Sequence, residues 1–76
     1  MTVKELIQTI PFNEENTFFT VIFNTHVNGK PFQKMKQFYK LVFLRNSKYW
    51  SKEIESWEYK QHREIYLWEV VIYIGG

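Results

Sequence analysis

The chain has 76 residues and a net charge of +2; hydrophobic residues make up 45% of it and aromatic residues 20%, and it contains no Cys and no Asp. The absence of Cys excludes disulfides, thiolate metal sites and a Cys nucleophile. This length indicates one domain, residues 1–76, whose small core depends on large aromatic side chains. No apolar run reaches the roughly 18–20 residues that span a bilayer, and no signal peptide is evident, so we expect a cytoplasmic protein.

The first predicted element is a short helix. Thr2 and Glu5 match the T-x-x-E capping box, which satisfies two backbone donors at a helix start. Apolar residues follow at helical spacing, at Val3, Leu6, Ile7 and Ile10. Pro11 ends the helix. An isolated helix of this length does not hold in water, so its apolar side must pack on the rest of the fold.

A hairpin follows the loop "PFNEEN". The segment "TFFTVIFNT" (17–25) predicts a strand that is apolar on both faces, and therefore central or covered on both sides. Asn28-Gly29 predicts a type I′ turn. A second strand is expected over 30–37, at an edge of the sheet because Pro31 lacks an N–H. Lys34 and Lys36 then have a structural explanation, since charged side chains keep strand edges from pairing with other chains.

The segment "QFYKLVFLRN" (37–46) fits either a continued strand or a short helix, and we favour the helix. Its predicted apolar side is formed by Phe38, Leu41, Val42 and Arg45. Phe43 and Leu44 would then point away from the core and be partly exposed.

Two more strands complete the expected fold. "EIESWEY" (53–59) predicts the third, "KQHR" (60–63) a loop, and "EIYLWEVVIYI" (64–74) the fourth, which is apolar on both faces and therefore central. The order αββαββ indicates an α+β domain, with a four-stranded antiparallel sheet and two short helices packed on one face.

Catalytic patterns are sparse in this sequence. A nucleophilic triad needs an acid and a His base next to Ser or Thr, but there is no Asp, and His26 and His62 are expected in solvated loops. Glu53 and Glu55 have the i, i+2 spacing of a carboxylate pair, which we interpret as a solvated strand face. No Gly-rich phosphate loop is present. We therefore predict a non-enzyme without catalytic residues, metal or cofactor.

The charge is distributed unevenly. Residues 30–52 hold seven cations and no acid, whereas the rest of the chain holds three cations and all eight Glu. Such asymmetry can signal a charged partner. The candidate partner-binding residues are Lys34, Lys36, Lys40, Phe43, Arg45, Lys48, Tyr49, Trp50 and Lys52. Of these, the group from Arg45 to Lys52 is the hardest to explain by edge protection.

Three interpretations of this segment remain open. It could bind an acidic protein through aromatic anchors with a basic rim. It could bind nucleic acid, with cations on phosphates and aromatics on bases. Alternatively, its lysines could pair internally with Glu53, Glu55 or Glu58 on a neighbouring strand. A homo-oligomer formed through strand edges or through Phe43 and Leu44 is a further possibility.

Three segments together resemble small early-region proteins of phages and prophages of Gram-positive bacteria. They are "MTVKELI", "FFTVIFNTHVNGKPF" and "KYWSKEIESWEYKQHREIYLWEVVIYI". The resemblance implies a phage accessory protein in the bacterial host cytoplasm that binds and inhibits or modulates a host protein complex, such as a CRISPR defence system. The group has no assigned activity and no functional residues to carry over. The basic middle of this chain is more strongly charged than is usual for the group, which suggests a specialised partner, either a host or a phage protein.

Overall fold

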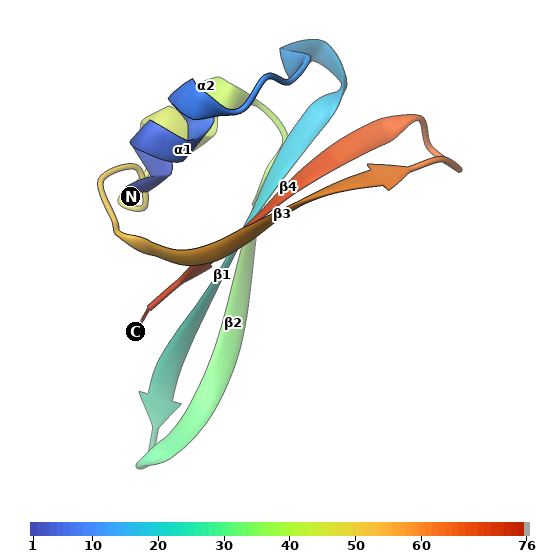
Figure 1. Ribbon diagram of the computed structural model, residues 1–76. Helices are drawn as coiled ribbons and strands as arrows, with labels where there is room; N and C mark the ends of the chain where they lie inside the picture. Colours follow the sequence, from blue (N-terminus) through green and yellow to red (C-terminus); the bar gives the residue numbers. More distant parts are fainter. Residues whose placement is uncertain (76) are drawn as a thin grey trace.

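The computed structural model describes residues 1–75 and forms a small α+β fold (Figure 1). Its elements in chain order are α1 (Val3–Thr9), the 3₁₀ turn η1 (Glu14–Asn16), β1 (Thr17–Val27), β2 (Lys30–Phe38), α2 (Leu41–Arg45), β3 (Ile54–His62) and β4 (Leu67–Ile74). The four strands form one sheet in the order β2-β1-β4-β3. Both helices lie on the same side of this sheet.

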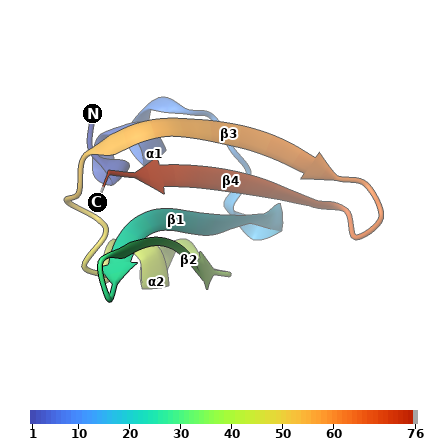
Figure 2. The same cartoon turned by 90° about the horizontal axis from the view of Figure 1, so that it is seen from below.

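The sheet is mixed, so the prediction of an antiparallel sheet is wrong. The β1–β2 and β3–β4 pairs are antiparallel, but the two central strands, β1 and β4, run parallel. The cause is the segment between α2 and β3, residues 46–53, which carries the chain across the sheet to the far edge (Figure 2). β3 occupies that edge, and β4 then returns into the gap beside β1. A parallel neighbour requires such a crossover rather than a tight turn.

The N-terminal helix forms as predicted and is joined to the connector 46–53. Its capping box is present, and Val3, Leu6 and Ile7 are buried. The backbone N–H groups of Val3 and Lys4 donate to the carbonyls of Lys52 and Trp50, both at 3.0 Å. Because the first N–H groups of a helix have no partner inside it, these contacts satisfy the helix start and fix the connector together.

The first hairpin also follows the prediction. Asn28 and Gly29 have φ values of 54° and 77°, the left-handed conformations that a type I′ turn requires. β1 is central and β2 is an edge strand. The pairing of β1 with β4 ends at Phe23, so the last part of β1 and the first part of β2 extend beyond the rest of the sheet as a two-stranded arm.

The second helix exists, but its buried side differs from the predicted one. Leu41 and Leu44 are buried, with Leu44 fully inaccessible, whereas Val42 and Phe43 are exposed. Phe38 belongs to β2, so the helix begins only at Leu41, and its two buried leucines lie three residues apart. Counting the helical repeat from Phe38 placed Leu44 on the wrong side.

The second hairpin is shifted relative to the prediction. β3 continues through His62, and the turn occupies residues 63–66 instead of "KQHR". Tyr66 lies in the turn with φ 55° and is 86% exposed, so β4 begins at Leu67 and not at residue 64. β4 is central, as predicted.

One hydrophobic core lies between the helices and the sheet. It consists of Val3, Leu6, Ile7, Phe19, Val21, Phe38, Leu41, Leu44, Val70, Ile72 and Ile74. The opposite side of the sheet, called here the open face, has no helix over it. Among residues 1–75, no helix is long and apolar enough to cross a membrane.

Candidate partner-binding surface

Lys34 and Lys36 point to the helix side of β2 but lie beyond the area that the helices cover. In the β1–β2 register Lys34 is opposite Phe23 and Lys36 is opposite Val21, both of which face the helix side. Directly opposed residues in an antiparallel pair have their side chains on one face, with Cβ atoms about 5 Å apart. The two lysines are exposed. They therefore form an edge of the helix-side surface next to Phe23.

Tyr49 joins this edge to the connector 46–53. Its ring centroid lies 5.4 Å from that of Phe23 and 6.1 Å from that of Phe38. On the helix side of β2, Lys34, Lys36 and Phe38 occupy successive alternate positions, and Tyr49 packs on Phe38 at one end of this row and on Phe23, the partner of Lys34, at the other. Lys48 places its Nζ 5.5 Å from the Tyr49 ring centroid, within cation–π range.

The connector is held in one conformation by a set of hydrogen bonds. Ser47 Oγ donates to the carbonyl of Leu44 (2.7 Å) and accepts from the N–H of Tyr49 (3.2 Å). The N–H of Lys52 donates to the carbonyl of Tyr49 at 3.0 Å. Together with the two bonds from α1, these contacts fix the backbone from which Lys48 and Lys52 project.

Four of the predicted cations thus surround the region of Tyr49, and we call them the basic cluster: Lys34, Lys36, Lys48 and Lys52. Lys48 and Lys52 line a pocket together with Phe23, Tyr49 and Ile74. The segments that contribute are distant in sequence, and the packing of Tyr49 on Phe38 joins the connector to β2. The predicted set is brought together in part.

The other predicted residues lie outside this cluster. The guanidinium of Arg45 lies 6.0 Å from the centre of the Trp50 ring, and Phe43 is 57% exposed on α2. Lys40 precedes α2 and lines a separate hollow with Glu14 and Glu15, so acids accompany it. Tyr49 and Trp50 are half-buried against the core, which gives both of them a structural role.

The basic segment is not neutralised inside the fold. Among residues 1–75, the salt bridges are Met1–Glu53, Lys60–Glu58 and His62–Glu69, and none of them includes a cation of residues 30–52. β2 and β3 are opposite edges of the sheet. Pairing of the β2 lysines with the glutamates of β3 is therefore contradicted, because β1 and β4 lie between the two strands.

A second group of polar side chains lies on the open face and was missed by sequence reasoning. The Thr20 hydroxyl donates to Glu69 Oε2, and His62 Nε2 lies 2.8 Å from Glu69 Oε1. The Phe18 ring packs against both His62 and Tyr39. His62 is thus a packed strand residue, and the prediction of a solvated loop is wrong. His26 also lies in a strand, β1, where it is exposed.

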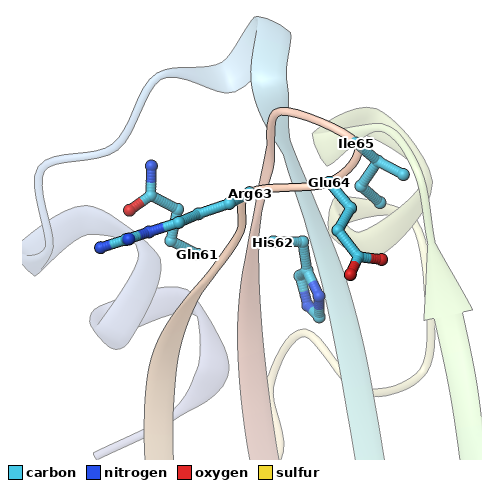
Figure 3. Close-up of a pocket in the computed structure, with 5 residues that line it drawn as sticks. All are labelled: Gln61, His62, Arg63, Glu64 and Ile65. Atoms are coloured by element: carbon cyan, nitrogen blue, oxygen red, sulfur yellow. The ribbon is translucent and has the colours of Figure 1, made fainter.

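The misplaced turn explains this error. With "KQHR" assigned to a loop, residues 60 and 62 had no strand face, whereas a continued strand would have placed His62 beside Leu67 and close to Glu69. Figure 3 shows the result: His62 points along the sheet below the turn, whereas Arg63 extends to the other side of the hairpin.

This polar group does not have the arrangement of a nucleophilic triad. In a triad the base contacts the hydroxyl and the acid contacts the base. Here the Thr20 hydroxyl and the His62 imidazole both bind the same carboxylate, that of Glu69, whose side chain is 13% exposed. The arrangement satisfies a largely buried acid, which would otherwise be costly.

Three groups have shifted pKa values with visible causes. The hydrogen bond from the Thr2 backbone lowers the pKa of Glu5, and the Thr2 side chain adds to this. The Tyr73 hydroxyl donates to Glu58, which raises the pKa of Tyr73. The Met1 ammonium donates to Glu53 at 2.9 Å, and this contact raises the pKa of the ammonium. All three are contacts of the fold and none belongs to the basic cluster.

Glu53 and Glu55 do not form the carboxylate pair that their spacing allowed. Glu53 binds the N-terminus, and a register shift between Ile54 and Ser56 interrupts the strand alternation at Glu55. In residues 1–75 no three His or Glu side chains gather in a way that could hold a metal ion. Comparisons of the chain with protein-family models, curated proteins and solved structures find no match.

Proposed function

We propose that this protein is a non-enzymatic binding module whose basic cluster attaches to an acidic surface of a partner protein. The observation that carries the proposal is that, among residues 1–75, none of Lys34, Lys36, Lys48 and Lys52 forms a salt bridge, while they project from the hydrogen-bonded connector and a strand edge. Clustered charges of one sign steer association with the opposite sign and select among partners.

The packing of Tyr49, the aromatic residue that joins the two parts of the cluster, favours a protein over nucleic acid. Stacking on bases needs an accessible aromatic face. Tyr49 packs against Phe23 and Phe38 and carries Lys48 over its ring, so little of that ring is available. The cluster also contains no Arg, the side chain best suited to bind phosphate through two parallel hydrogen bonds.

The resemblance to phage accessory proteins extends the proposal to a biological role. We infer that the partner belongs to a host protein complex of a Gram-positive bacterium, which the bound module inhibits or modulates, a CRISPR defence complex being one example. In this role the module catalyses no reaction, because it acts by covering a surface of the host protein complex.

The test is capture from a nuclease-treated lysate of such a bacterium, followed by reconstitution with the purified partner. We expect a stoichiometric complex on size-exclusion chromatography that weakens with salt and is lost in the Lys34→Glu plus Lys36→Glu variant. Lys60→Glu plus Arg63→Glu, in the hairpin of the opposite edge, changes the net charge by the same amount and is the matched control, which should leave the complex intact. A partner that disappears after nuclease treatment, or a complex indifferent to the β2 lysines, would refute the proposal.

Nucleic-acid binding remains the second candidate, and the two-stranded arm supports it. The arm extends beyond β4 and carries Lys30, and Lys34 lies at its base, opposite Phe23. A two-stranded ribbon fits the major groove of DNA. Binding of a 20-base-pair duplex with a steep salt dependence, in the absence of any protein partner, would favour this candidate over the first.

A further inference from the structure

The pocket beside the basic cluster combines an apolar floor with a cationic rim. Its apolar lining residues are Phe23, Tyr49 and Ile74 from three different segments, and Lys48, Lys52, Asn24 and Gly75 complete the lining. Ile74 ends β4, and the connector passes close to that end of the strand (Figure 2). The rim and the floor therefore come from elements that are separately fixed in the fold.

The size of the pocket limits what it can hold. Its volume is about 220 Å³. Pockets that enclose whole small-molecule ligands have roughly 300–1,000 Å³. This pocket is smaller and matches a side chain of a larger partner better than a free cofactor or nucleotide.

The charges around the pocket define the kind of side chain. The Lys48 ammonium lies over the Tyr49 ring. The backbone of Lys52 is hydrogen-bonded both to Tyr49 and to Val3 of α1, so the position from which its side chain projects is fixed. One acid borders the pocket, because the Glu55 carboxylate lies against Gly75: a Cβ placed on that glycine would be 2.8 Å from Glu55 Oε1. Within residues 1–75, two cations against one acid leave the rim of this pocket positive.

We propose that this pocket receives an acidic side chain of the partner protein, which lies on the apolar floor and is bound at its carboxylate by Lys48 and Lys52. The inference rests on the proposed function and gives it an anchor point. An aspartate or glutamate suits the site because a carboxylate accepts charge-assisted hydrogen bonds from ammonium groups, while its methylene groups can cover Phe23 and Ile74.

The experiment uses the full chain labelled with ¹⁵N and an acetylated, amidated eight-residue peptide in which Glu alternates with Leu. We expect amide shifts concentrated at residues 23–24, 48–52 and 74–75. The same peptide with Gln in place of Glu should cause no shift there. Shifts centred on other residues, equal shifts with the neutral peptide, or none at millimolar peptide would overturn the inference.

Variants test the two lysines directly. Lys48→Gln plus Lys52→Gln should weaken peptide binding by at least about fivefold through loss of charge-assisted contacts. Lys60→Gln plus Arg63→Gln removes the same charge from the turn end of the β3–β4 hairpin, whereas Ile74 of the pocket lies at its other end. This variant should change the affinity for the peptide by less than about twofold, since exposed charges far from the pocket are largely screened. Glu55→Gln should strengthen binding. If the two double variants weakened peptide binding equally, net charge alone would explain the effect, and the proposal that the pocket binds an acidic side chain would be refuted.

The outcome separates this inference from the proposed function. If the reconstituted complex requires Lys34 and Lys36 but tolerates Lys48→Gln plus Lys52→Gln, the pocket is not an anchor and the binding module stands. If no protein complex forms at all while the peptide still binds in the pocket, the proposed function fails and the acidic-side-chain site remains.

Discussion

The two hairpins differ in whether their charged side chains have partners within the fold. On β3 and β4, Lys60 pairs with Glu58, Tyr73 donates to Glu58, and His62 and Thr20 share Glu69. On β2, Lys34 and Lys36 form no salt bridge with any acid of residues 1–75, and they face a connector that adds further lysines. The difference shows that the charge asymmetry of the chain is kept in space and is not cancelled by folding, because the two charged strands are separated by the two central ones.

The comparison implies that the basic segment contributes to stability through its buried apolar residues and not through its cations. Leu44→Ala should therefore have the largest effect, a loss of about 3 kcal/mol in the free energy of unfolding, since it opens a cavity in the core. Urea denaturation followed by tryptophan fluorescence measures it. Phe43→Ala on the same helix is the control, with an expected loss under about 0.5 kcal/mol. Equal losses would mean that α2 faces the sheet differently.

In the paired hairpin, Glu69 should be the most important polar residue. Glu69→Ala leaves the buried Thr20 hydroxyl and His62 without their acceptor and should cost about 2 kcal/mol in the free energy of unfolding. The same denaturation measurement applies. Glu64→Ala, in the exposed turn, should change stability by less than about 0.5 kcal/mol. If Glu69→Ala cost no more than this control, the open-face network would have no stabilising role.

Charge reversal on the two edges should then give different results. Lys60→Glu places a new acid opposite Glu69 and near Glu58, and should destabilise the fold by up to about 1 kcal/mol at low salt. Lys34→Glu plus Lys36→Glu should change stability by less than about 0.5 kcal/mol, because no ion pair among residues 1–75 is lost. Thermal unfolding in low and high salt distinguishes them. A large loss in the β2 variant would show that these lysines serve the fold.

The smallest expected effect concerns pH at the helix start. The pKa of Glu5 is lowered in the fold, so its contribution is complete above the ordinary glutamate pKa and is lost as the pH falls through the lowered value. Glu5→Gln keeps a capping residue but removes this titration. The variant should show a shallower loss of stability in acid, measured by denaturation from neutral pH downwards. An unchanged acid profile would mean that the capping carboxylate does not contribute to it.

Local signals were sufficient for several parts of the fold. The capping box placed α1, Asn28-Gly29 placed the first turn, and the apolar residues on both faces identified β1 and β4 as central strands. Each of these depends on neighbours within a few residues. The exposure of Phe43 was also predicted, but that of Val42 and Leu44 was reversed, because the starting residue of a five-residue helix sets which side faces the sheet.

The sequence by itself determined the α+β class, the edge position of β2 and the segregation of seven cations into residues 30–52. Only the tertiary structure decided the parallel pairing of β1 with β4, the packing of His62 against Phe18 and Glu69, and the gathering of Lys34 and Lys36 with Lys48 and Lys52 around Tyr49. These features depend on the path of residues 46–53 across the sheet. That path is set by packing between segments far apart in the chain, which no local pattern encodes.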